Sequence, residues 1–202
     1  MKLFLTSAAC KVLPKIAIML GRPAKGMKLA FIPTAGDPYG DNKPWMDADR
    51  AELVELGFLV TDFDLKDKNE TDTRAELSKY DVIFVAGGNV YYLLDYARKS
   101  GFLTVVRELV NNGTIYIGSS AGSYLACPTI EAAGWKHADR NVVGLKDLRA
   151  LGLVDFIVVA HYEPELSEDI EAHKKSTKYP VIILTDQQMV VVTDDKNEVV
   201  SC

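Results

Sequence analysis

The sequence predicts an open, mostly parallel, doubly wound α/β sheet with helices on both faces. Short apolar runs of strand length recur along the 202 residues, and segments of helical composition separate them. Several runs are apolar at nearly every position, which is typical of strands buried on both faces of a parallel sheet. The runs are residues 2–5, 28–32, 58–63, 82–86, 114–117, 156–160, 181–184 and 189–193. Neither an internal repeat nor a linker interrupts the alternation, so we expect a single domain over residues 1–202.

Helices are expected between these strands. The segments are residues 46–56, 71–79, 90–100, 103–112 and 167–178. Gly57, Gly101 and Gly113 follow three of them directly, and glycine is the usual residue just past a helix end. The last two strand-like runs, 189–193 and 198–201, flank a short polar segment, which predicts a C-terminal antiparallel β-hairpin.

Composition excludes several classes of protein. The chain has 23 Lys and Arg against 28 Asp and Glu, a net charge of −5 with no long run of like charge. We therefore expect neither a nucleic acid nor a membrane surface as a partner. No apolar run approaches the roughly 18 residues of a membrane span, and the N-terminal run is too short for a secretory signal. The three widely spaced cysteines have no metal-type or disulfide pattern, which favours a cytoplasmic protein without a metal.

The most informative stretch is residues 114–122, Thr-Ile-Tyr-Ile-Gly-Ser-Ser-Ala-Gly. It places Gly118-x-Ser120-x-Gly122 between a strand and a helix, the arrangement of a nucleophile elbow. Such a turn is so tight that the residues two before and two after the serine must be small. A simple strand-to-helix turn with a serine N-cap is the alternative interpretation. The elbow interpretation makes Ser120 the candidate nucleophile.

A serine nucleophile needs a base, and the chain has three histidines. His137 and His173 lie in polar, charged segments typical of the surface. His161 directly follows the apolar run 156–160, so we expect it at the carboxyl end of a buried strand. That end is the same sheet edge as Ser120, and His161 is therefore the candidate base.

The acid that orients the histidine is less sharply indicated. Candidates are Glu131, Asp139, Glu163 and Glu165. A side chain two residues past His161 rarely reaches its Nδ1 atom, whereas Glu131 and Asp139 lie in the segment after the elbow helix. We favour Asp139 and keep Glu131 as the alternative. For the oxyanion we expect the N–H of Ala121, with a second donor from the Gly-Gly-Asn turn at 87–89.

With these motifs, the chain resembles the peptidase E family of serine peptidases. These are aspartyl dipeptidases, related to cyanophycinase, with a fold similar to class I glutamine amidotransferases. The resemblance covers nearly the whole chain and includes Gly-x-Ser-Ala-Gly at 118–122 followed by Pro-Thr-Ile at 128–130. It implies that Ser120 is the nucleophile, His161 the base and Gly88 an oxyanion donor. It also implies a possible homodimer, and it requires no cofactor.

The chain departs from that family in two places. An ungapped match puts Gly134 and Trp135 where the family has its acid, and a small insertion would bring Asp139 there. The resemblance also implies an arginine, downstream of the histidine, that holds the substrate aspartate. Here no arginine follows Arg149, and lysine lacks the bidentate fork. The expected function is hydrolysis of small peptides, without an established preference for N-terminal Asp.

Two other functions remain open at this point. One is a ligand-binding or regulatory protein on the same scaffold, with an incomplete triad. The other is an esterase of the α/β-hydrolase type, which shares the order Ser, Asp, His along the chain. The short chain and the lack of an HGGG-like segment weigh against the esterase.

Overall fold

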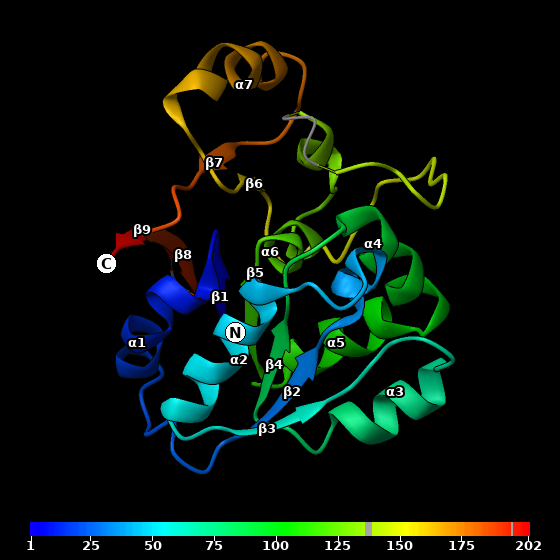
Figure 1. Cartoon of the computed structure of the whole chain (residues 1–202), viewed down its shortest axis with the longest axis vertical. Helices are drawn as coiled ribbons and strands as arrows, with labels where there is room; N and C mark the ends of the chain where they lie inside the picture. The colour runs from blue at the N-terminus through cyan, green and yellow to red at the C-terminus, as the bar shows by residue number, and fades with distance from the viewer. Residues whose placement is uncertain (136–138, 195) are drawn as a thin grey trace.

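A computed structural model describes residues 1–135, 139–194 and 196–202. Within these residues, a central sheet of seven strands has the order β3-β2-β4-β5-β1-β8-β9 (Figure 1). The strands are β1 (Lys2–Thr6), β2 (Lys28–Ile32), β3 (Leu59–Asp62), β4 (Val82–Val85), β5 (Ile115–Ser119), β8 (Gln188–Thr193) and β9 (Asn197–Ser201). The strands from β3 to β1 pair in parallel, and β8 and β9 complete one edge in antiparallel pairing. The expected parallel sheet and the C-terminal hairpin are confirmed.

Helices cover both faces of the sheet (Figure 1). They are α1 (Ala9–Met19), α2 (Pro44–Glu55), α3 (Glu70–Leu77), α4 (Val90–Lys99), α5 (Phe102–Asn111), α6 (Ala121–Ala126) and α7 (Ser167–Lys174). Three short 3-10 helices, η1 (Thr34–Tyr39), η2 (Glu131–Gly134) and η3 (Pro164–Leu166), lie in the connections. Alternate strand residues enter different cores: Leu3 and Leu5 pack in the cluster with α4 and α5, and Phe4 packs in the cluster with α1 and α2. Burial on both faces explains the continuous apolar runs.

The helix α1, which contains Pro14, was not among the helices expected from the sequence. An interior proline removes one helical hydrogen bond and normally bends or ends a helix. Here Val12, Leu13 and Ile16 are fully buried against the sheet. Packing of this apolar face outweighs the cost of the proline, which local propensity alone does not reveal.

A second, two-stranded parallel sheet pairs β6 (Ile157–Val159) with β7 (Val181–Ile183). The expectation that these runs belong to the main sheet was wrong. The edge of β1 is occupied by β8 instead, and β6 and β7 form a separate pair (Figure 1). Because β6 and β7 are parallel, with Val159 opposite Ile183, their carboxyl ends lie side by side.

The turn from β5 into α6 is packed against β4 without space for side chains. A Cβ added to Gly122 would lie 2.1 Å from the Val85 carbonyl oxygen, and one added to Gly118 would lie 2.6 Å from the Gly122 carbonyl carbon. The buried Tyr116 hydroxyl donates to the Gly122 carbonyl at 2.7 Å, which ties the first turn of α6 to β5. The requirement for small residues at both positions, expected from the sequence, is therefore steric.

We predict that Gly122→Ala destabilises the fold by about 2 kcal/mol or more, because the new methyl group overlaps the backbone of β4. Gly134→Ala is the matched control, since the nearest atom to its added Cβ is the movable Tyr91 hydroxyl at 3.2 Å. Urea unfolding of both variants measures the difference. Equal stability of the two variants would contradict the steric explanation.

Candidate active site

Ser120 occupies the turn between β5 and α6 with φ 47° and ψ −104°. This left-handed backbone is costly for a residue with a side chain and is kept only where the surroundings enforce it. The Ser120 N–H donates to the Thr6 carbonyl at 3.0 Å, which ties the turn to the end of β1. The strained turn leaves the Ser120 side chain lining a surface cavity rather than buried in the core.

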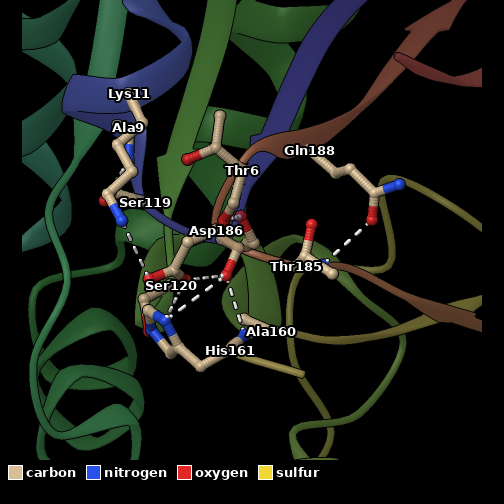
Figure 2. Close-up of polar contacts among 12 residues, drawn as sticks. Thr6, Ala9, Lys11, Ser119, Ser120, Ala160, His161, Thr185, Asp186 and Gln188 are labelled. Carbon is tan, nitrogen blue, oxygen red and sulfur yellow. Dashed lines mark hydrogen bonds and ion pairs between the residues drawn. The ribbon is translucent and has the colours of Figure 1, made fainter. Parts of the chain in front are cut away.

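His161 lies beside Ser120, as the sequence predicted. Its Nε2 is 2.9 Å from Ser120 Oγ (Figure 2). It follows β6 by two residues and also has a positive φ of 54°. The preceding Ala160 N–H donates to the Tyr124 hydroxyl at 3.1 Å, so α6 anchors the chain just before the histidine. Both strained residues of this pair thus depend on contacts with other elements.

Asp186, rather than Asp139, is the carboxylate at the other ring nitrogen. His161 Nδ1 lies 2.6 Å from Asp186 Oδ1 (Figure 2). The expectation for Asp139 is therefore corrected: its carboxylate accepts the Val90 N–H at 2.9 Å, at the start of α4. Glu131, the alternative acid, begins η2, and its backbone N–H donates to Thr129 Oγ1.

Pairing of β6 with β7 explains why Asp186 reaches the histidine. Asp186 follows β7 by three residues, and His161 follows β6 by two, so parallel pairing delivers both to one edge. The sequence contained part of this signal, since an acid lies just past the apolar run 181–184. Which strand neighbours β6 could not be read from the chain.

Ser7 joins these two residues and was not anticipated. Its fully buried hydroxyl donates to Asp186 Oδ1 at 2.8 Å and accepts the His161 backbone N–H at 2.7 Å. Burial raises the pKa of Asp186, but hydrogen bonds from Ser7 and His161 and the charge of Lys11 outweigh it, so this pKa lies below its ordinary value. An ionised Asp186 holds the proton of the imidazole on Nδ1 and leaves Nε2 as an acceptor toward Ser120.

Both residues predicted as oxyanion donors lie near Ser120. Gly88 lines the cavity that Ser120 lines, and Ala121 begins α6 directly after the serine. Gly88 has φ 144°, and a Cβ there would lie 2.2 Å from the Ala35 carbonyl oxygen, so only glycine fits. Among the described residues, neither the Gly88 nor the Ala121 N–H donates to a protein acceptor. The role of both groups as oxyanion donors stays a prediction.

The structure describes one of the other two histidines. His173 is exposed and stacks on Trp135, with ring centroids 5.3 Å apart. It was expected at the surface, and this is confirmed. His137 lies outside the described residues.

The cavity beside Ser120 has a volume of about 370 Å³. Tyr39 and Trp45 form part of its wall in edge-to-face contact, with centroids 5.1 Å apart. Both come from the segment after β2, at the carboxyl edge where open α/β sheets place their sites. The lining also includes Asp49 of α2, which is only 2% exposed. Burial raises the pKa of Asp49 to about 6, and polar contacts from Ser119 and Cys10 lower it only in part.

Metal ligation and membrane insertion find no support in the part of the chain that the structure describes. No group of three or more His, Cys, Asp or Glu side chains there is arranged to hold a metal ion. No helix in that part is long and apolar enough to cross a membrane.

Sequence comparison identifies the family. The profile of Peptidase family S51 matches residues 3–200, so the chain belongs to this family and is a serine-type peptidase. An uncharacterized peptidase of Listeria monocytogenes is 31% identical over 89% of this chain and 89% of its own. Peptidase E of Salmonella newport is 30% identical over 80% of this chain and 67% of its own.

Structural comparison agrees with this assignment. A crystal structure of a candidate peptidase E protein from Listeria monocytogenes covers 100% of this chain and 98% of its own, with a TM-score of 0.88 and 25% identity. A peptidase from an acI-B1 actinobacterium shares the fold, with a TM-score of 0.65 and 19% identity over 100% of this chain and 87% of its own. The resemblance to peptidase E inferred from the motifs is confirmed.

The raised pKa of Asp49 predicts a pH dependence of stability. The folded protein holds a proton on Asp49 that the unfolded chain, with a carboxyl pKa of 3.8, has already released. Stability therefore falls as pH rises from about 4 to about 6, and this contribution is constant above that range. Between pH ~4.5 and pH ~7.5 we expect a loss of roughly 2 kcal/mol from this group.

Asp49→Asn should remove this loss, since the amide does not titrate. Urea unfolding at the two pH values, for the wild type and the variant, measures it. Asp47→Asn is the control, because Asp47 lies on the same helix but is exposed. Parallel pH curves for wild type and Asp49→Asn would contradict the assignment.

Proposed function

We propose that the protein hydrolyses small peptides, as a dipeptidase does, through a triad of Ser120, His161 and Asp186. The observation that carries this proposal is the continuous chain of contacts from Ser120 Oγ through His161 to Asp186 Oδ1, at 2.9 Å and 2.6 Å. Nucleophile, base and orienting acid are each within hydrogen-bonding distance of the next, which is the geometry that a serine hydrolase needs.

In the acylation half, Ser120 Oγ attacks the scissile carbonyl carbon while His161 Nε2 takes the hydroxyl proton. The carbonyl oxygen becomes an oxyanion that accepts hydrogen bonds from the Gly88 and Ala121 N–H groups. The C–N bond then breaks, and the imidazolium returns its proton to the leaving amine. Asp186 stays ionised and stabilises the imidazolium throughout.

Water completes the cycle in the deacylation half. His161 removes a proton from a water molecule that attacks the acyl carbon, and the same proton then returns to Ser120 Oγ as the ester bond breaks. The half-exposed imidazole, with 46% of its side chain accessible, leaves a path for this water. A cavity of about 370 Å³ lies at the small end of the range for small-ligand sites, which favours short peptides as substrates.

Ser120→Ala tests the nucleophile. We expect complete loss of covalent labelling by a fluorophosphonate probe, and a loss of roughly 10⁴-fold or more in dipeptide turnover, because Ser120 Oγ is the hydroxyl at hydrogen-bonding distance from His161 Nε2. Peptide mapping of the labelled wild type locates the adduct, and Ser119→Ala, one residue away, should still be labelled. Labelling of Ser120→Ala at full yield would refute the assignment. An inert wild-type serine together with ligand-induced thermal stabilisation would favour the ligand-binding alternative.

A second experiment compares Asp186→Asn with Asp139→Asn. We expect Asp186→Asn to lower kcat by about 10⁴-fold, because the amide favours the wrong imidazole tautomer. Asp139→Asn leaves the contact between His161 and Asp186 intact, so its effect on kcat should be far smaller. Steady-state kinetics across a pH series separates kcat from KM for both variants. A larger kcat defect in Asp139→Asn would return the acid role to Asp139.

A further inference from the structure

Ser7 lies directly after β1 and contacts both residues that stand behind the nucleophile. Its Oγ donates to Asp186 Oδ1 at 2.8 Å, accepts the His161 backbone N–H at 2.7 Å and lies 3.3 Å from His161 Nδ1. Its own N–H donates to the carbonyl of Gln188, two residues past Asp186, at 3.4 Å. The residue is 0% exposed, so bulk water does not compete for its hydroxyl. The mechanism proposed above gives Ser7 no part.

The groups on either side of Ser7 fix the direction of its hydrogen bonds. A backbone N–H can only donate, so the Ser7 oxygen accepts from His161. Its single proton then has two acceptors within reach, and Asp186 Oδ1 is nearer than His161 Nδ1, at 2.8 Å against 3.3 Å. A charged acceptor also makes the stronger bond. Asp186 Oδ1 therefore receives the Ser7 proton while it lies 2.6 Å from Nδ1 (Figure 2).

This direction favours one protonation state of the pair. Burial raises the pKa of Asp186, and among the groups that lower it the hydrogen bond from Ser7 contributes most. An ionised Asp186 cannot donate, so the ring proton of His161 belongs on Nδ1 and Nε2 is the acceptor. Without the Ser7 hydroxyl, burial of Asp186 is less opposed. The tautomer with the proton on Nε2, which cannot take the Ser120 proton, then becomes more populated.

Ser7 also supports the strained backbone that carries the base. His161 has φ 54°, a conformation that is costly for a residue with a side chain. The Ala160 N–H donates to the Tyr124 hydroxyl at 3.1 Å, and the next N–H, that of His161, donates to Ser7. Two successive N–H groups are thus held by hydroxyls from α6 and from the end of β1. One of these hydroxyls, that of Ser7, also holds the acid.

We propose that Ser7 is a positioning residue of the hydrolytic reaction. Its hydroxyl holds Asp186 and the backbone of His161 in the arrangement that presents Nε2 to the Ser120 hydroxyl. Ser7 acts through these two residues. The inference rests on the proposed peptidase function. A hydroxyl with a purely structural role would stabilise the fold without changing how fast Ser120 reacts.

The experiment measures the second-order rate constant for fluorophosphonate labelling of Ser120 in three variants of Ser7. We expect labelling to slow by about 10- to 100-fold in Ser7→Ala, because a hydrogen bond to a charged group is lost. Ser7→Cys is close in shape but a weak donor, and it should be slowed similarly. Ser7→Thr retains the hydroxyl and should recover most of the wild-type rate.

Ser100→Ala is the matched control. Ser100 is also fully buried, and its hydroxyl donates to the Tyr96 carbonyl at 2.8 Å, at the end of α4. Urea unfolding gives the stability of every variant. Nuclear magnetic resonance of isotope-labelled histidine reports which ring nitrogen of His161 carries the proton. We expect Nδ1 in the wild type and in Ser100→Ala, and a mixture of tautomers in Ser7→Ala.

The outcomes separate this inference from the proposed function. Labelling of Ser7→Ala at the wild-type rate, with the proton still on Nδ1, would overturn the inference and leave the peptidase function intact. An equal loss of rate in Ser7→Ala and Ser100→Ala would attribute the defect to general loss of packing and overturn it as well. Slow labelling of a Ser7→Thr variant as stable as the wild type would also count against it. Absence of labelling at Ser120 in the wild type would instead contradict the proposed function itself.

Discussion

The contact on which the site depends is the close approach of the β5–α6 turn to β4. Gly122 lies so near the Val85 carbonyl that even a methyl group would overlap it. This packing, together with the hydrogen bond from Ser120 N–H to Thr6, holds Ser120 in a left-handed conformation that a free chain would leave. Three adjacent strands, β4, β5 and β1, thus cooperate to hold one serine. The buried parallel sheet is rigid enough to bear this strain because helices cover both of its faces.

The second sheet, β6 with β7, brings His161 and Asp186 close to that serine. The strands β6 and β7 are only three residues each, and they pair in parallel so that both chains leave toward the main sheet. Ser7, at the end of β1, then contacts the backbone of His161 and the carboxylate of Asp186 with one hydroxyl. Ser120 is positioned by the main sheet, and His161 and Asp186 by the second sheet. Ser7 links the two sheets by its hydrogen bonds to His161 and Asp186. This arrangement orients the imidazole without enclosing it, and substrate and water can reach it.

The rest of the cavity beside Ser120 is lined by aromatic and acidic side chains. The cavity beside Ser120 is lined by the aromatic residues Tyr39, Trp45 and Tyr124 and by two carboxylates, and the described part of the lining has no lysine or arginine. The three hydrogen-bonded side chains at the serine and the residues that line the rest of the cavity thus come from separate elements. Ser120, His161 and Asp186 follow strand ends, while residues of η1 and α2 and the side chain of Asp139 line the rest of the cavity. Specificity can change in such a fold without changes at the triad.

The chain's own pattern of residues determined the fold class and pointed to the candidate nucleophile and the candidate base. Continuous apolar runs specify strands buried on both faces, and Gly118-x-Ser120-x-Gly122 specifies a turn that only small residues permit. Both patterns involve only residues that are close together in the chain, so they can be recognised in the sequence. The neighbour of β6, the helix around Pro14 and the positions of Ser7, Asp49 and Asp186 were decided by tertiary structure. Asp186 lies 25 residues from His161 and Ser7 lies 154 residues from it, and neither stands in a recognisable motif. Strand pairing brings them together, and pairing depends on which edge is left free once β8 has taken its place beside β1.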